Sequence, residues 1–333
     1  MRFFLFILIL IIVLVGAWTS IQLFHPAGPK TAQIVTFAPG SSVWKIATEL
    51  EKRGVVHSRY AFTLWARLQK GTLKAGTYRF DHAAPLTEVY QRLRRGDVYT
   101  IALTIPEGYN IFDIAQAAER AGLGKSQDFL AAEQEDTELV RDLDPGAQSL
   151  EGYLFPATYP VVPTATPQEV LAAMVRRFRE EASKLGLRGD VHAVVTLASL
   201  VERETPEEAD RELVAGVFTN RLARRMPLDT DPSVIYAALL DRRYRGTIYA
   251  SDLKADSAYN TYTHIGLPPG PICNPGVPSL RAAMQPAKTD YLYFVSDPGS
   301  PGHSRFATTL QEHQKNVRAY RNEQRVGNGR KGQ

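Results

Sequence analysis

The stretch Val191–Thr205 carries the clearest candidate for acid–base chemistry. Its apolar residues recur at helical spacing, and Asp190 is a suitable N-cap for such a helix. Glu202 falls at the edge of the apolar stripe, where a carboxyl group loses hydration and can hold a proton near neutral pH. Glu202 is therefore our candidate general acid. The alternative is an ordinary amphipathic helix that ends in surface charges and stops at Thr205–Pro206.

Residues suited to binding a sugar are found on both sides of this helix in the sequence. Tyrosine rings stack on sugar faces, while Asn, Asp and Glu side chains hydrogen-bond to hydroxyl and N-acetyl groups. The segment 258–278 is too rich in proline and glycine for regular structure, and long ordered segments of this kind are often functional. The candidate substrate-binding residues are Glu151, Asn220, Asp231, Tyr259, Asn260, Tyr262 and Asn274.

Several of these residues also have a purely structural interpretation. Asp231 precedes a proline, so we favour an N-cap of the following helix over a catalytic role. Asn220 could bond to a loop, and the tyrosines of the segment 258–278 could pack within that segment. Glu204 is interpreted only as a charge partner for a neighbouring arginine.

Other kinds of site lack their sequence signatures. The seven histidines form no HExxH pattern, and Cys273 is the single cysteine, so we expect no metal site and no disulfide. The sequence contains no phosphate-binding loop or nucleophile elbow, and no lysine near Glu202 suits a pyridoxal-dependent lyase, so no cofactor is expected. The net charge of +4 suits cell-wall polymer or lipid headgroups but is too small to indicate nucleic acid binding.

The N-terminal segment is predicted to anchor the chain in a membrane. Residues 3–17 carry no charge, and apolar residues continue to Phe24, which gives the about 20 residues that a bilayer requires. A cleaved signal peptide is the alternative, because Val15–Ala17 resembles a cleavage site. In both cases the rest of the chain lies outside the cytoplasm. A stiff, proline-containing linker at residues 25–32 follows.

A short internal repeat follows the linker. When Gly40 is aligned with Gly108, the two copies match at apolar positions, at a second glycine and at a serine. The matched pairs are Val43 and Ile111, Ile46 and Ile114, Ala47 and Ala115, Gly54 and Gly122, and Ser58 and Ser126. Each copy predicts a strand, a turn, a helix, a glycine stop and a second helix. Two copies are too few for a solenoid, so we expect a small structural or binding module that is used twice.

Eight short blocks, in order over nearly the whole chain, carry a more specific signal. They are Thr104–Gly108, Leu150–Pro156, Leu197–Thr205, Val217–Leu222, Thr230–Tyr236, Ala258–Tyr262, Gly266–Gly270 and Tyr291–Phe294. These blocks resemble the YceG-like family of endolytic murein transglycosylases. The resemblance implies that Glu202 corresponds to the catalytic glutamate of that family. The segment 297–306 departs from the tighter glycine-rich turn of the family, so it assigns no role to His303.

With 333 residues, the chain is long enough for two folded parts and an anchor. We expect an α+β protein with a transmembrane anchor at 1–24, a linker at 25–32, a LysM-like duplicated region at 33–148, a catalytic domain at 149–325 and a frayed tail at 326–333. The resemblance implies a single-pass inner-membrane enzyme with a periplasmic catalytic domain. It would cleave nascent peptidoglycan glycan strands to 1,6-anhydro ends, and so end elongation near the peptidoglycan synthases. A muramidase and a non-catalytic glycan-binding scaffold are the alternatives.

Overall fold

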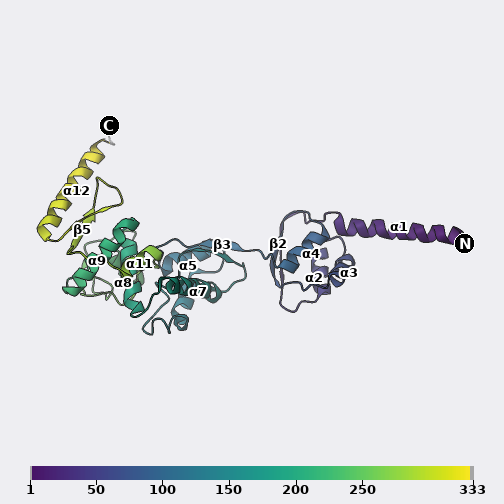
Figure 1. Ribbon diagram of the computed structural model, residues 1–333, viewed down its shortest axis with the longest axis horizontal. Coiled ribbons are helices and arrows are strands. Elements are labelled where there is room, and N and C mark those ends of the chain that lie inside the picture. The colour runs from purple at the N-terminus through teal and green to yellow at the C-terminus, as the bar shows by residue number, and fades with distance from the viewer. Residues whose placement is uncertain (1, 331–333) are drawn as a thin grey trace. The chain divides into compact units, whose positions relative to one another are not determined.

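The computed structural model describes residues 2–330, and the chain forms two compact units (Figure 1). The first unit contains the residues up to Ile101 together with Pro160–Thr164. The second contains Ala102–Tyr159 and the chain from Ala165 onward. Helices and strands occur in both units, so the expected α+β class is confirmed.

Helix α1 (Arg2–Phe24) occupies the segment where an anchor was predicted. Several of its apolar side chains are exposed, among them Phe4, Leu14 and Trp18. Over residues 2–330, no helix combines the length and the apolar character needed to cross a membrane. The segment is helical as expected, but the predicted membrane span is not confirmed.

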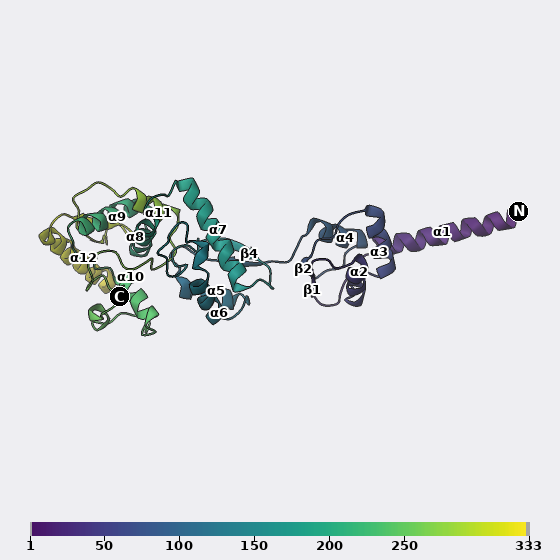
Figure 2. The same cartoon turned by 90° about the horizontal axis from the view of Figure 1, so that it is seen from below.

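The rest of the first unit is built around a two-stranded sheet. The elements are β1 (Gln33–Phe37), α2 (Val43–Lys52), α3 (Arg59–Gln69), β2 (Gly76–Phe80) and α4 (Leu86–Arg95) (Figure 2). Strand β1 pairs antiparallel with β2, from Gln33 opposite Phe80 to Phe37 opposite Gly76. Apolar side chains of the strands and of the three short helices meet in one core that includes Phe62, Tyr78 and Tyr90. This unit therefore has its own hydrophobic core.

The predicted repeat is confirmed at the level of secondary structure. Its second copy forms β3 (Ile101–Thr104), α5 (Ile111–Arg120) and α6 (Ser126–Glu135), which matches the order β1, α2, α3 of the first copy. Gly40 and Gly108 turn the chain before the first helix with φ of 79° and 76°, a left-handed conformation that favours glycine. The helices α5 and α6 belong to the second unit.

The second unit is mainly helical. It contains α7 (Pro167–Leu185), α8 (Val191–Glu204), α9 (Glu208–Ala223), α10 (Asp231–Leu240), α11 (Val277–Met284), β5 (Tyr293–Ser296), β6 (Ser304–Ala307) and α12 (Leu310–Arg330). Strand β4 (Thr158–Val161) begins in this unit, and its last two residues belong to the first unit. Strand β3 pairs with β4, and β5 pairs antiparallel with β6. Helix α8 packs against α9, α10 and α11. Helix α12 continues into the segment where a frayed tail was predicted, and residues 331–333 of that tail lie outside the described residues.

Candidate functional site

Helix α8 positions both glutamates that close the Val191–Thr205 stretch. The side chain of Asp190 accepts a hydrogen bond from the backbone N–H of Ala193 at 2.9 Å, which is the predicted N-cap. Glu202 and Glu204 are two residues apart, which turns their side chains by about 200° around the helix axis. They therefore face different surroundings.

The carboxylate of Glu202 is buried and ion-paired. Its side chain is 5% exposed, and its Oε1 lies 3.1 Å from Nη2 of Arg211 on α9. The backbone N–H of Gly276 donates to Oε2 of Glu202 at 3.0 Å. The carboxylate is therefore removed from water, as the sequence indicated, but an arginine balances its charge.

A pocket of about 400 Å³ lies next to Glu204. Its wall combines carboxylates, one arginine and several aromatic rings from α8, α9, α10, β5, α12 and the loops between them. The lining residues are Glu204, Phe218, Arg221, Leu228, Asp229, Asp231, Tyr262, Tyr293, Phe294, Leu310 and His313. A pocket with aromatic walls and a few convergent polar groups is typical of a ligand site.

Glu204 has the properties expected of a general acid. Burial and the nearby negative charge of Asp231 raise its pKa to about 7, while Arg221 acts in the opposite direction. A carboxyl group with that pKa is partly protonated at neutral pH and can donate a proton to a bound substrate.

The polar groups around Glu204 are held in place by hydrogen bonds. The hydroxyl of Tyr262 donates to Oδ1 of Asp231 at 2.7 Å. Nη1 of Arg221 donates to Oδ2 of Asp229 at 3.1 Å, and the guanidinium lies 5.2 Å from the centroid of the Tyr293 ring. Asp229 has a φ of 52°, which is uncommon for a residue other than glycine. The pocket wall is therefore fixed in shape before a ligand arrives.

Two of the predicted substrate-binding residues, Asp231 and Tyr262, line this pocket. The N-cap interpretation of Asp231 is wrong by one residue. The N-cap of α10 is Thr230, whose side chain accepts the N–H of Ser233, and Asp231 is the first helical residue. The carboxylate of Asp231 is therefore available to the Tyr262 hydroxyl.

Glu151 and Asn274 meet in a buried network that does not line the pocket. Nδ2 of Asn274 donates to Oε1 of Glu151 at 2.8 Å, and the N–H of Ile111 donates to its Oε2 at 3.0 Å. Burial raises the pKa of Glu151 to about 8. Oδ1 of Asn274 accepts the N–H of Leu154 at 2.8 Å. These contacts join the start of α5 to the loop before α11.

Asn220, Asn260 and Tyr259 also lie outside the set of pocket-lining residues. Asn220 donates to the carbonyl oxygens of Thr289 and Tyr291 at 2.7 and 2.9 Å. Asn260 is fully buried and donates to three backbone carbonyls between residues 252 and 255. The ring of Tyr259 lies beside that of Tyr236 at 5.1 Å, and burial raises the pKa of Tyr259 to about 12. These side chains satisfy or cover irregular backbone near the pocket.

The sequence indicated neither the pocket beside Glu204 nor the contact of Arg211 with Glu202. Glu202 and Glu204 both follow the apolar stripe of α8, and the helical period predicts that their side chains point in different directions. Only the structure shows that the pocket lies on the side of Glu204. The partner of Glu202 is nine residues away on another helix.

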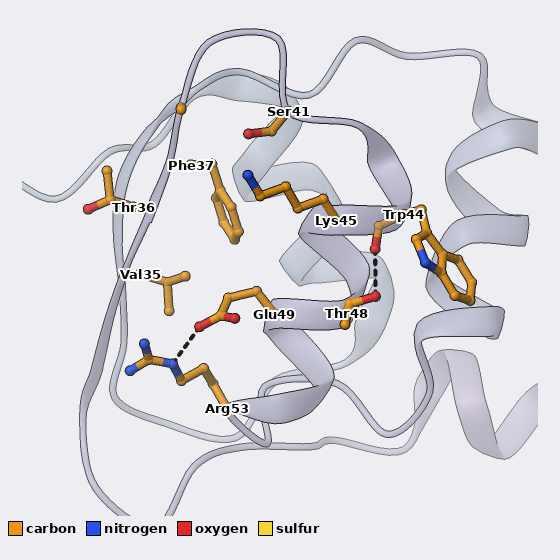
Figure 3. Close-up of a pocket in the computed structure, with 10 residues that line it drawn as sticks. Val35, Thr36, Phe37, Ser41, Trp44, Lys45, Thr48, Glu49 and Arg53 are labelled. Carbon is orange, nitrogen blue, oxygen red and sulfur yellow. Dashed lines mark hydrogen bonds and ion pairs between the residues drawn. The ribbon is translucent and has the colours of Figure 1, made fainter.

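A further pocket, of about 520 Å³, lies in the first unit between β1 and α2 (Figure 3). Its one lining carboxylate, Glu49, points toward Arg53 and is ion-paired with it at 2.8 Å. None of the predicted site residues lies there.

No metal site competes with this assignment in the part of the chain that the structure describes. Residues 2–330 contain no group of three or more His, Cys, Asp or Glu side chains arranged to hold a metal ion.

The chain is similar to a set of known proteins. Residues 35–319 match the model of the YceG-like family. A Bacillus subtilis (strain 168) protein named endolytic murein transglycosylase is 36% identical over 316 residues, which covers 87% of this chain and 85% of the relative. A protein of the same name from Streptococcus pneumoniae (serotype 2) is 35% identical over 324 residues, and the match spans 87% of this chain but 59% of that longer relative. A crystal structure of a YceG-like protein from Listeria monocytogenes has a TM-score of 0.56 at 34% identity and covers 86% of this chain and 99% of that one.

Proposed function

This chain belongs to the YceG-like family, and from that membership we infer that it is an endolytic murein transglycosylase. It is a lyase that cleaves the bond between N-acetylmuramic acid and N-acetylglucosamine within peptidoglycan strands and leaves 1,6-anhydro ends. The observation that carries the assignment of its active site is Glu204, a carboxyl group with a pKa of about 7 in the wall of an aromatic-lined pocket.

One acid is sufficient for this reaction. Protonated Glu204 donates its proton to the glycosidic oxygen as the bond to C1 of the muramic residue breaks. The resulting carboxylate then takes the proton from the C6 hydroxyl of the same residue while O6 forms a bond to C1. Because the nucleophile belongs to the substrate, no second carboxylate has to activate water. The net change is one glycosidic bond broken and one internal ether bond formed.

The other pocket residues bind the sugar. The ring of Tyr262 offers a face for stacking, and Asp231 and Arg221 offer hydrogen-bonding groups. We propose that Asn220 and Asn260 act indirectly, since their amides hold the backbone of pocket-lining segments. Glu151, Asn274 and Tyr259 support the neighbouring loops in the same way.

The sequence-based assignment of the acid to Glu202 stays a prediction, and two variants decide between the glutamates. Glu204→Gln and Glu202→Gln are incubated with peptidoglycan, and soluble products are analysed by mass spectrometry. The wild type should release muropeptides with anhydro ends. Glu204→Gln should release none while it still binds the glycan.

Each contrary product pattern has a definite meaning. Reducing muramic ends from the wild type would identify a muramidase. Glycan binding without cleavage would identify a scaffold. Wild-type activity of Glu204→Gln would remove Glu204 from the acid role.

We propose in addition that α1 attaches the enzyme to the inner membrane, with the second unit on the periplasmic side, and that the β1–α2–α3–β2 part of the first unit is a LysM-like module. The exposed apolar side chains of α1 support the attachment. In this position the enzyme cuts nascent strands beside the synthases and ends their elongation. Removal of α1 should shift the protein from the membrane fraction to the soluble fraction, and a full-length chain that is already soluble would contradict the proposal.

A further inference from the structure

A cluster of charged side chains surrounds Glu202. It joins Glu202 of α8, Arg211 of α9 and Glu107 of the loop before α5. We propose that Glu202 is a positioning residue, whose ion pair with Arg211 and hydrogen bond from Gly276 fix the last turn of α8 and so hold Glu204 in its pocket. This inference rests on the proposed role of Glu204 as the general acid.

Arg211 depends on Glu202 for its charge balance. Its side chain is 7% exposed, Nη2 lies 3.1 Å from Oε1 of Glu202, and Nη1 lies 3.5 Å from Oε2. The carboxylate of Glu107 is more distant, at 3.7 Å, and is half exposed. Within residues 2–330, Nε of Arg211 has no hydrogen-bond partner. A buried guanidinium is costly unless a carboxylate compensates for its lost hydration, so Glu202 is the main partner that keeps Arg211 in place.

A hydrogen bond connects Glu202 to the start of α11. The N–H of Gly276, the N-cap of α11, donates to Oε2 of Glu202 at 3.0 Å. The carboxyl group of Glu107 lies against the other side of Gly276, where a Cβ atom would be 1.9 Å from its Oε1. An alanine at position 276 would require the half-exposed carboxyl group of Glu107 to move aside. One carboxylate joins α8, α9 and α11.

The ion pair with Arg211 and the hydrogen bond from Gly276 are both made by Glu202, two residues before the proposed acid Glu204. Helix α8 ends at Glu204, and the N–H of Thr205 closes the last turn on the carbonyl of Val201 at 3.3 Å. The final turn of a helix frays when side chains do not hold it. Arg203 also donates to the carbonyl of Gly108, at 3.3 Å. With Glu202 bound, the last turn keeps Glu204 directed into the pocket, and general acid catalysis depends on that direction.

The experiment separates positioning from stability. Glu202→Gln, Arg211→Met and the double variant Glu202→Leu with Arg211→Met are made in the full chain, and Glu212→Gln is the control. Glu212 is an exposed neighbour of Arg211, and no ion pair joins it in the described part of the chain. Thermal unfolding, kcat, KM and the pH profile of anhydro-product release are measured for each variant.

The single variants should lower both Tm and kcat, with kcat reduced on the order of 100-fold and KM changed little. The double variant replaces the buried ion pair by apolar groups, so its Tm should return to within a few degrees of the wild type. Its kcat should stay about 100-fold low, and the alkaline limb of its pH profile should move because Glu204 is no longer fixed. Glu212→Gln should match the wild type.

Two results would overturn the inference. If kcat of the double variant recovers together with Tm, the pair is merely structural. If every variant keeps the wild-type kcat, Glu202 positions nothing. If the proposed function itself is wrong, the results differ from these. In that case the wild type releases no anhydro products, or Glu204→Gln remains active.

Discussion

Replacing the proposed acid should stabilise the protein above about pH 4.5, with the full effect at pH values above 7. Burial and the charge of Asp231 raise the pKa of Glu204 from 4.5 to about 7. The carboxyl group is therefore easier to ionise in the unfolded chain than in the folded one. Below pH 4.5 the group is protonated in both states and costs the folded protein no stability. As the pH rises from 4.5 through 7, the group ionises more readily in the unfolded chain, and the folded protein loses stability.

The magnitude follows from the two pKa values. The difference between them corresponds to about 3 kcal/mol of destabilisation in the wild type at pH 8. Glu204→Gln removes this penalty because its amide does not ionise. The variant should therefore exceed the wild type by about 3 kcal/mol in the free energy of unfolding at pH 8, and by roughly nothing at pH 4. For a folded unit of this size, that is a rise in Tm of about 6–12 °C at pH 8.

Urea unfolding of both proteins at pH 4 and pH 8, followed by circular dichroism, measures the difference. Other titrating groups are common to the two proteins, so their contributions cancel in the comparison. The same stability difference at both pH values, or a variant less stable than the wild type at pH 8, would refute the reasoning about the surroundings of Glu204.

Three other substitutions test contacts around the site. Gly276→Ala places a Cβ atom 1.9 Å from Oε1 of Glu107, the end of a half-exposed side chain that can move aside, so it should cost less than about 1 kcal/mol in a thermal melt, and a larger loss would contradict that freedom of Glu107. Tyr262→Ala should raise KM for glycan strands several-fold while Tyr262→Phe, which keeps the ring, should raise it less; equal effects would argue against stacking on the ring. Asn274→Ala leaves the buried carboxyl group of Glu151 without its amide donor and should cost about 1–3 kcal/mol in chemical denaturation, whereas an unchanged midpoint would show that the bond is dispensable.

The elements of the fold were largely predictable because they depend on local rules. Ser126 is the first residue of α6 and not its N-cap, which is Lys125. Asp190 caps α8 and Ser58 caps α3 as expected, and Gly54 and Gly122 follow α2 and α5 with positive φ. These features need only the conformational freedom of glycine and the N-cap preference for short polar side chains.

The proposed active site was less predictable because it depends on contacts between distant segments. An apolar stripe identifies the buried side of α8, but the pocket beside Glu204 forms only when Tyr262 and Tyr293 are brought to it from later in the chain. The ion pair of Glu202 likewise requires the packing of α9 on α8. No local sequence pattern shows that Glu204 lies beside the pocket and that Glu202 forms the ion pair.

Residue type alone was also a weak guide to sugar binding. Asn260 and Asn274 have the amides that a carbohydrate site uses, yet both are fully buried and bonded to the protein itself. Their surroundings are segments of irregular backbone, whose carbonyl and N–H groups lack partners from regular secondary structure. Such groups must be satisfied by side chains, so an amide in a proline-rich segment has a structural use as well as a binding use.

The pH dependence of anhydro-product release tests the role of Glu204 most directly. Because the acid must be protonated in the free enzyme, kcat/KM should fall as the pH rises through about 7. Asp231→Asn removes a negative charge that raises the pKa of Glu204, so the fall should begin at a lower pH in that variant. A profile that stays flat from pH 6 to about 9, or an alkaline limb that Asp231→Asn does not move, would contradict the assignment of Glu204 as the acid.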